Sequence, residues 1–260
     1  MANGNNGKKV IGIYELTGCA GCALEVINLE DKVLKVFDAF EVAVFLMAKS
    51  DNDYEKEVDV ALVDGSVSTE EEIEKIKKIR EKAKVLVALG DCACFGGIQA
   101  GMEEEDFEKE FKKVYGDNKL EVVKPVFSKP IDAYVKVDFY LPGCPPELSS
   151  IERVLGDIWM GNIPQEYYRP VCAECRWAEN ECLLFENKVC LGPITRGGCN
   201  ARCPSAGIPC IGCRGPVRDA QVHTLFNVLK EKFKGDKELL RKMKIFAYSG
   251  FKKFLKDLKK

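Results

Sequence analysis

The chain has 260 residues, of which 46% are hydrophobic and 31% are charged, and it contains 13 Cys but a single His. This composition is typical of a folded protein with its own hydrophobic core, and it excludes disordered, collagen-like and coiled-coil proteins. The net charge of -2 gives no indication of nucleic-acid binding, no apolar run is long enough for a membrane span, and the start MANGNNGKKV lacks an apolar leader. We therefore expect a cytoplasmic protein.

Five short, mostly apolar segments in the first part of the chain resemble strands that are buried on both faces of a sheet. They are residues 10–16, 41–47, 58–63, 85–89 and 135–141. Because helical patterns separate these segments, parallel strands with crossover helices are favoured. We predict a flavodoxin-like, doubly wound parallel sheet.

Helix starts are predicted by two capping boxes, in which Ser is followed three residues later by Glu. The pairs are Ser68 with Glu71 and Ser149 with Glu152. A further apolar stripe over residues 107–114 predicts another helix.

The composition changes after residue 161. Residues 162–171 contain two prolines and are typical of a linker, and residues 172–215 contain eight Cys with little periodic hydrophobicity. We therefore predict two domains, residues 1–161 and residues 162–260, of which the second is smaller and rich in cysteine.

The C-terminal residues favour an amphipathic basic helix. Phe251, Phe254, Leu255 and Leu258 follow the i, i+3, i+4, i+7 spacing among lysines. Its role stays open between a solvated face on the core, a docking surface for an acidic subunit and a membrane-surface helix.

Five cysteines of the first domain follow the ends of predicted strands. Cys19 and Cys22 lie in TGCAGC, Cys92 lies in GDCACFGG together with Cys94, and Cys144 lies in LPGCPPE. Loops beyond the carboxyl ends of parallel strands converge on the ligand-binding crevice of such a sheet. We predict that Cys19, Cys22, Cys92 and Cys144 form one four-thiolate site, with Cys94 as a buried free thiol.

Eight cysteines of the second domain are regularly spaced and fill two further four-thiolate sites. The simplest partition is Cys172, Cys175, Cys182 and Cys190 for one site, and Cys199, Cys203, Cys210 and Cys213 for the other. Exchange of a ligand between the two sites, as in ferredoxins, stays open. Iron–sulfur clusters and zinc both fit four thiolates, and the glycines near the first site favour the cluster because backbone N–H groups can reach its sulfurs.

The single His223 weakens any hydrolytic reading, because a catalytic triad or a paired-histidine metal centre would depend on this one residue. No GxxxxGK or GxGxxG motif is present. We expect the chemistry to depend on sulfur, with no catalytic residue in this chain.

The three loops in order, CxxC at Cys19, GxCxxxGG at Cys92 and PGCPP at Cys144, resemble the small subunit of nickel-iron hydrogenases. That family shares its N-terminal fold with the 20-kDa subunit of respiratory complex I. The likeness extends from Val10 to about Gly215 and is strongest to the delta subunits of archaeal cytosolic sulfhydrogenases.

The resemblance implies the identity of each site. The first site would bind the proximal cluster, Cys199, Cys203, Cys210 and Cys213 the medial cluster, and Cys172, Cys175, Cys182 and Cys190 the distal cluster. Many relatives use a His at the Cys172 position and hold a three-iron medial cluster. Because Cys172 and Cys203 supply the missing thiolates here, all three clusters are expected to be 4Fe-4S.

By the same resemblance, the chain would relay electrons between a nickel-iron large catalytic subunit and iron–sulfur or flavin/NAD(P)-binding subunits. The nickel site would lie in the large subunit, because every CxxC here is already assigned. The terminal acceptor (NADP, sulfur or deazaflavin) stays open.

Two alternatives are retained. A subunit of a complex I-like membrane oxidoreductase is disfavoured, since that relative carries adjacent cysteines in place of CxxC and lacks the eight-cysteine extension. A zinc-stapled scaffold without a redox role would use the same four-thiolate geometry.

Overall fold

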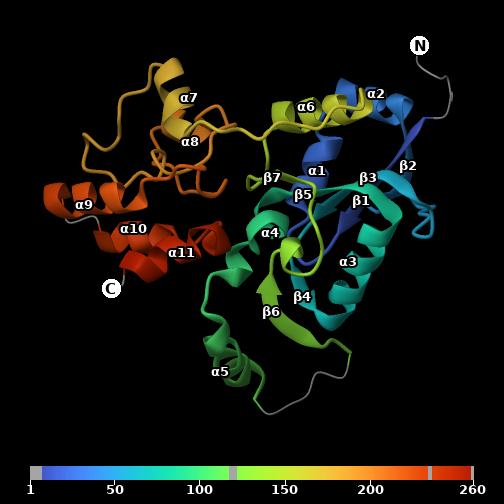
Figure 1. Cartoon of the computed structure of the whole chain (residues 1–260), viewed down its shortest axis with the longest axis horizontal. Coiled ribbons are helices and arrows are strands. Elements are labelled where there is room, and N and C mark those ends of the chain that lie inside the picture. The colour runs from blue at the N-terminus through green and yellow to red at the C-terminus, as the bar shows by residue number, and fades with distance from the viewer. Residues whose placement is uncertain (1–7, 117–121, 234–235, 259–260) are drawn as a thin grey trace.

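The computed structural model describes residues 8–116, 122–233 and 236–258. Its main sheet has five parallel strands in the spatial order β2-β1-β3-β5-β7. The strands are β1 (Lys9–Glu15), β2 (Phe40–Phe45), β3 (Val58–Asp64), β5 (Ala83–Leu89) and β7 (Phe139–Leu141). In chain order this arrangement is 2-1-3-4-5, which is the flavodoxin-like order, and the predicted fold class is confirmed (Figure 1).

Helices cover both faces of the sheet. One face carries α1 (Gly21–Ile27), α2 (Asp31–Ala39) and α6 (Leu148–Trp159), and the other carries α3 (Glu70–Lys82) and α4 (Gly90–Phe95). Alternate residues of each strand enter the two cores: Ile11 and Ile13 pack with α1 and α6, whereas Tyr14 packs on the α3 side. The sheet is buried on both sides, which explains its nearly continuous apolar strands.

The carboxyl ends of four strands are aligned across the sheet. Glu15 pairs with Asp64, Asp64 pairs with Leu89, and Leu89 pairs with Leu141. The segments that follow these residues therefore leave the sheet along one edge.

The fifth strand is shorter than predicted, because pairing begins at Phe139 rather than at residue 135. Before β7, Asp138 bonds to Leu86 of β5 partly through its side chain. Its backbone N–H donates to the Leu86 carbonyl at 2.9 Å, and its Oδ2, in place of a backbone carbonyl, accepts from the Leu86 N–H at 2.9 Å. The second strand also ends early, and Leu46 and Met47 lie exposed in a turn.

Both capping predictions are wrong in detail. Thr69, not Ser68, is the N-cap of α3, where its side chain accepts from the N–H of Glu72. Helix α6 begins at Leu148, so Ser149 lies inside the helix.

The structure also contains a second sheet, which the sequence did not predict. It is the antiparallel pair β4 (Val67–Thr69) and β6 (Pro125–Lys129). The predicted stripe over residues 107–114 lies in α5 (Glu104–Tyr115), where Phe107 stacks near Phe111 and Phe127. The short turns η1 (Ile98–Ala100) and η2 (Ile131–Ala133) complete this part.

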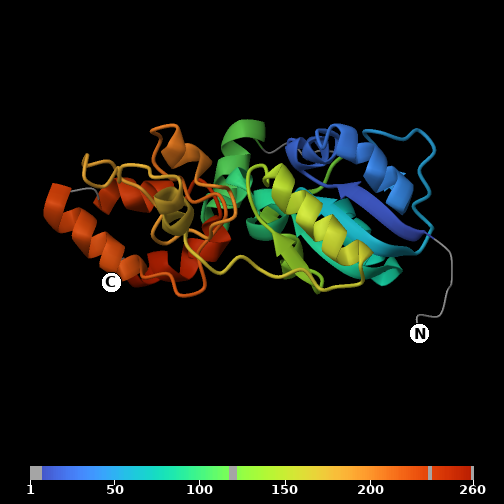
Figure 2. The same cartoon turned by 90° about the horizontal axis from the view of Figure 1, so that it is seen from above.

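The cysteine-rich part of the chain lies beside the sheet and has little regular structure (Figure 2). Its helices are α7 (Val171–Trp177), α8 (Arg202–Ser205), α9 (Val222–Phe233), α10 (Asp236–Lys242) and α11 (Tyr248–Leu258). A separate hydrophobic cluster runs from Val171 to Leu255.

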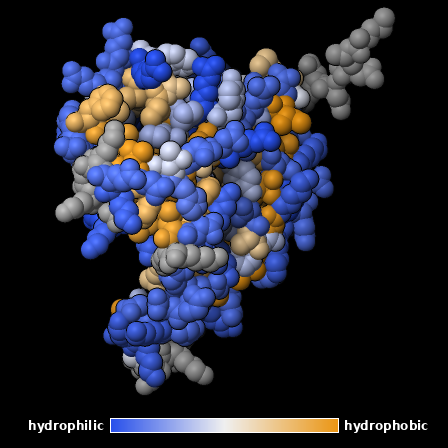
Figure 3. Space-filling view, turned by 60° about the vertical axis from the view of Figure 1, so that its left-hand side comes forward, coloured by the Kyte–Doolittle hydropathy of each residue, from blue (hydrophilic) through white to orange (hydrophobic). Residues whose placement is uncertain are grey.

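Helix α11 packs its apolar stripe on this cluster. Phe251 and Leu255 are buried, and Phe254 and Leu258 are partly buried against it. This packing agrees with the first of the three interpretations, a charged face over the core, and the role of the exposed basic face stays a prediction. On this side of the molecule, hydrophobic patches interrupt a largely hydrophilic surface (Figure 3).

Candidate functional site

The first two predicted ligands lie directly after β1. Cys19 is exposed in the connecting loop, and Cys22 is buried in the first turn of α1. Asp64, at the end of β3, accepts the N–H of Ala23 at 3.2 Å, and the backbone of Cys22 also acts to lower the pKa of its carboxyl group. A carboxylate that accepts the free N–H groups of a first helical turn fixes the direction in which that turn begins.

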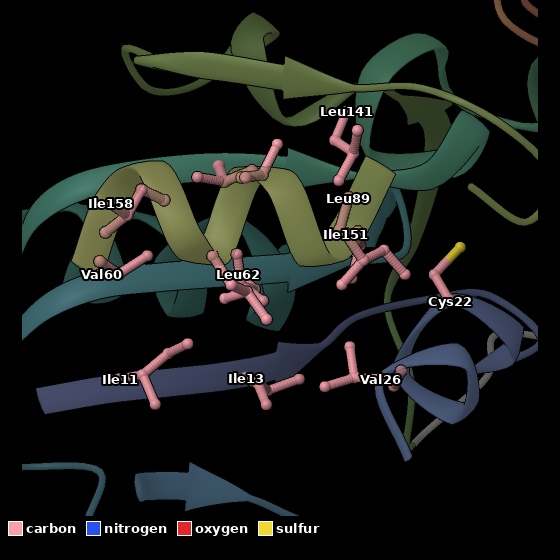
Figure 4. Close-up of a cluster of buried hydrophobic side chains, with 14 of the residues drawn as sticks. Ile11, Ile13, Cys22, Val26, Val60, Leu62, Leu89, Leu141, Ile151 and Ile158 are labelled. Atoms are coloured by element: carbon pink, nitrogen blue, oxygen red, sulfur yellow. The ribbon is translucent and has the colours of Figure 1, made fainter. Parts of the chain in front are cut away.

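Figure 4 shows Cys22 at the end of the hydrophobic cluster between the strands and α6, with its sulfur directed away from the labelled aliphatic side chains. The thiol therefore borders the core at the carboxyl edge of the sheet and faces the other cysteine loops.

Cys92 and Cys144 follow β5 and β7. The N–H of Asp91 donates to the carbonyl of Gly143 at 2.8 Å, which ties the α4 turn to the Cys144 loop. The prolines Pro142, Pro145 and Pro146 surround Cys144, and the peptide bond before Pro145 is cis.

These thiols lie close enough together to change one another's pKa values. Burial raises the pKa of Cys22, and Asp64, Cys92 and Cys144 act in the same direction. Burial raises the pKa of Cys144 to about 11, with Asp91 and Cys19 as the next causes. Like charges would repel in an empty site, and a cationic iron–sulfur core would offset that repulsion.

Two glycines leave room for the sulfurs. A Cβ on Gly90 would lie 2.2 Å from the Sγ of Cys22, and a Cβ on Gly97 would lie 2.6 Å from the Sγ of Cys92. Both glycines have positive φ angles of +85° and +71°, which disfavour other residues. The cradle around these thiols is thus built from backbone, as a bulky inorganic cluster requires.

In the group from Cys172 to Cys190, the thiols of Cys172 and Cys190 each lie near Cys175 and Cys182. Burial raises the pKa of Cys172 to about 12, followed by the charges of Cys190, Cys175 and Cys182. Cys172 and Cys175 lie on α7, and the other two come from the irregular segment that follows it.

The remaining four thiols line one cavity of about 90 Å³. They are Cys199, Cys203, Cys210 and Cys213. The N–H of Cys210 donates to the Sγ of Cys190 at 3.3 Å, so this group adjoins the preceding one. Cys144 lines the same cavity, so this group also adjoins the group at the sheet edge.

Among the described residues, no three His, Cys, Asp or Glu side chains come close enough together to hold one metal ion. Thiolates that bind a cube of four irons and four sulfides contact it from outside, and they stand farther apart than the ligands of one tetrahedral zinc ion. The donors present are soft sulfurs, which is the ligand type that iron–sulfur clusters take.

Cys94 lies apart from these groups. It is buried in the α3-side core, and its Sγ lies 3.4 Å from the carbonyl of Ala88. The thiol packs as a small hydrophobic group, as expected for it.

Sequence reasoning missed four polar residues of the site. Asp64 is buried against α1, and Asp91 is buried with its Oδ2 lacking a hydrogen-bond partner in the described part of the chain. Glu174 and Arg214 are buried beside the C-terminal thiols. The only available signal was position, since Asp91, Glu174 and Arg214 are each next to or between cysteines.

A flavodoxin-like sheet with thiols along its carboxyl edge and a cysteine-rich extension places the protein among oxidoreductase subunits. Residues 19–158 match the family described as the 20 Kd subunit of NADH ubiquinone oxidoreductase. The match spans more than half of the chain, and the protein belongs to this family.

Similar proteins show which kind of subunit within this family the chain resembles. The chain is 45% identical to sulfhydrogenase 2 subunit delta of Pyrococcus furiosus, over 91% of this chain and 98% of that one. It is 34% identical to a subunit of the F420-non-reducing hydrogenase vhu of Methanocaldococcus jannaschii, over 79% of this chain and 81% of that one. The resemblance to hydrogenase small subunits is confirmed, and the chain is a component of a hydrogenase complex.

A solved structure agrees with this assignment. A chain of an NAD+-reducing [NiFe]-hydrogenase in the H2-reduced state is 28% identical, with a TM-score of 0.55, over 61% of this chain and 95% of that chain. None of the helices in the described part of our protein has the length and hydrophobicity to span a lipid bilayer.

Proposed function

We propose that this chain is the electron-relay subunit of a nickel-iron hydrogenase and holds three 4Fe-4S clusters in a row. The proximal ligands would be Cys19, Cys22, Cys92 and Cys144, the distal ligands Cys172, Cys175, Cys182 and Cys190, and the medial ligands Cys199, Cys203, Cys210 and Cys213. When bound, the clusters supply one-electron carriers whose potentials depend on charge, hydrogen bonds and solvent exposure.

The observation that carries the proposal is the continuity of the thiols. Three groups adjoin in the order proximal, medial, distal, through the contact of Cys144 with Cys213 and of Cys210 with Cys190. Such a row suits hopping of single electrons and serves no purpose in a scaffold held by isolated zinc ions.

The proposal divides the chain into residues 1–161, with the proximal site, and residues 162–260, with the medial and distal sites. Support comes from the hydrophobic clusters: two lie within the sheet region, and the third lies between Val171 and Leu255.

The nickel-iron large subunit would cover the carboxyl edge of the sheet. Apolar side chains are exposed there beside the proximal ligands: Leu24, on the same helix as Cys22, is 44% exposed, and Ile98, next to Gly97, is 60% exposed. Exposed apolar residues around a functional site mark a protein interface. The distal end would deliver electrons to iron–sulfur or flavin/NAD(P)-binding subunits.

The proposal is tested on the complex purified without oxygen. We expect a brown protein with about twelve iron and about twelve acid-labile sulfide per chain, as three clusters of four require. Zinc in place of iron, with no sulfide, would establish the scaffold alternative, and membrane-bound quinone-linked activity would establish the complex I-like one. The subunits that co-purify identify the acceptor.

The proposed interface is tested by Leu24→Glu and Ile98→Glu. Each should reduce recovery of the large subunit at least tenfold, because a charge would be buried without a partner. Leu34→Glu is the control, since Leu34 is 64% exposed on α2 and does not adjoin a cysteine loop. Unchanged recovery in both test variants would place the interface elsewhere.

A further inference from the structure

Arg214 joins two of the cysteine loops. It follows Cys213 in sequence and is only 3% exposed. Its Nε donates to the carbonyl of Gly197 at 2.7 Å, and its Nη1 donates to the carbonyl of Pro142 at 2.5 Å. Pro142 is two residues before Cys144, and Gly197 is two residues before Cys199. One buried side chain therefore links the proximal loop to the medial loop.

The two loops touch where this arginine holds them. Cys144 and Cys213 line the same cavity, and the backbone N–H of Cys144 lies close enough to the Cys213 thiol to act against the rise of its pKa, so a proposed proximal and a proposed medial ligand are neighbours. Because electron transfer between buried carriers weakens steeply with distance, a small retreat of the Pro142–Cys144 segment would slow transfer across this junction.

Glu174 supplies a counter-charge and holds the other side of the medial loop. It is 6% exposed, its Oε1 accepts the N–H of Gly198 at 2.6 Å, and its Oε2 accepts the N–H groups of Cys199 and Ala201 at 3.3 Å. Ala201 has a φ of 49°, an unfavourable conformation for a residue with a Cβ. The carboxylate stabilises this turn by satisfying its N–H groups.

The charge of Arg214 lies close to the medial thiols. Burial lowers the pKa of Arg214, and the neighbouring Cys199, Cys213 and Glu174 act against that effect. A guanidinium keeps its proton in proteins. A buried positive charge beside a thiolate-ligated cluster stabilises the reduced form, which carries one more negative charge.

We propose that Arg214 is a positioning residue that holds the Cys144 loop against Cys213 for electron transfer, and that its charge raises the reduction potential of the medial cluster. This inference rests on the proposed function. The two effects are separable, because lysine would keep the charge without the planar fork that reaches two carbonyl groups.

The test compares Arg214→Met and Arg214→Lys in the purified complex. Arg218→Met is the control, since Arg218 is an exposed arginine four residues further along the chain. Iron and sulfide are counted first. The medial potential is then measured by redox titration followed by electron paramagnetic resonance, and electron movement from the proximal to the medial cluster is measured by rapid freezing after hydrogen is added.

We expect Arg214→Met to lower the ratio of reduced to oxidised medial cluster about tenfold at the wild-type midpoint, ~59 mV for one electron. Arg214→Lys should keep this ratio within about threefold, yet slow proximal-to-medial transfer at least tenfold. The control should change neither quantity.

Wild-type potential and rate in a fully loaded Arg214→Met complex would overturn the inference. If Arg214→Met loses its iron, Arg214→Lys decides, and wild-type transfer in that variant rejects the positioning role. Loss of iron from both variants would assign Arg214 to cluster assembly and also overturn the inference. Failure of the proposed function is distinct, because the wild-type complex would then lack iron and sulfide.

Discussion

Asp91 accepts a hydrogen bond from the backbone N–H of Ala247 at 2.9 Å, across 156 residues of sequence. Both residues are buried. Asp91 lies in α4 beside Cys92, and Ala247 directly precedes α11. The start of the C-terminal basic helix is thereby attached to the turn that carries Cys92, a proposed proximal ligand.

This bond predicts how Asp91 variants behave. Asp91→Ala should leave the buried Ala247 N–H without an acceptor and destabilise the α11 start by about 1–3 kcal/mol. Hydrogen–deuterium exchange of residues 245–250 measures the effect. Asp91→Asn keeps an acceptor oxygen and should exchange more nearly like wild type. Equal protection in wild type and Asp91→Ala would show that the bond contributes nothing to this helix start.

The cradle at Gly90 predicts a loss of the proximal cluster. Gly90→Ala should place a methyl group 2.2 Å from the Sγ of Cys22 and displace that thiol, with loss of about four iron per chain. Gly116→Ala is the matched control, because Gly116 also has a positive φ, of +67°, and a Cβ there would have no described atom within 4 Å. The control should cost about 1–2 kcal/mol through backbone strain alone and keep its iron. A fully loaded Gly90→Ala protein would contradict the assignment of Cys22.

The two cysteines of α4 should respond differently to substitution. Cys92→Ser should lower the iron content by up to about four per chain, because a proximal thiolate is lost. Cys94→Ser should keep all clusters, since its thiol lies in the core at 3.4 Å from the Ala88 carbonyl. Iron analysis and the proximal electron paramagnetic resonance signal distinguish them. The opposite pattern would exchange the roles of the two residues.

Removal of iron should affect the two parts of the chain unequally. The segment from Cys172 to Cys213 has short helices and many irregular residues, so its order should depend on the clusters. Treatment with a chelator should abolish hydrogen-exchange protection there and leave β1, β3 and β5 protected. Retained protection of residues 172–213 after iron loss would show that the hydrophobic cluster suffices.

The parallel sheet and the position of its cysteines could be predicted because buried strands are apolar and CxxC motifs are local. The strand β6 has a short sequence that begins with proline, PVFSK, and gave no such signal. The late start of β7, at Phe139, depends on the side chain of Asp138, which accepts the N–H of Leu86 across 52 residues of sequence. No short stretch of sequence contains both residues.

The same limit applies to the site. The proposed ligand list rests on spacing, but the close approach of Gly90 to Cys22 joins two loops that are far apart in sequence. Arg214 reaches Pro142 across 72 residues. These contacts form only when distant segments pack together. The residues next to Arg214 in sequence therefore do not indicate which groups it bonds to.

The length of each strand determines where the loop that follows it begins. The aligned last residues are Glu15, Asp64, Leu89 and Leu141. Each extra amino acid within β3 or β5 would advance the attached loop by about 3.3 Å and turn its side chains to the opposite face. The connections far from this edge can therefore vary in length, whereas β3 and β5 must keep theirs if the proposed cluster ligands are to stay in place.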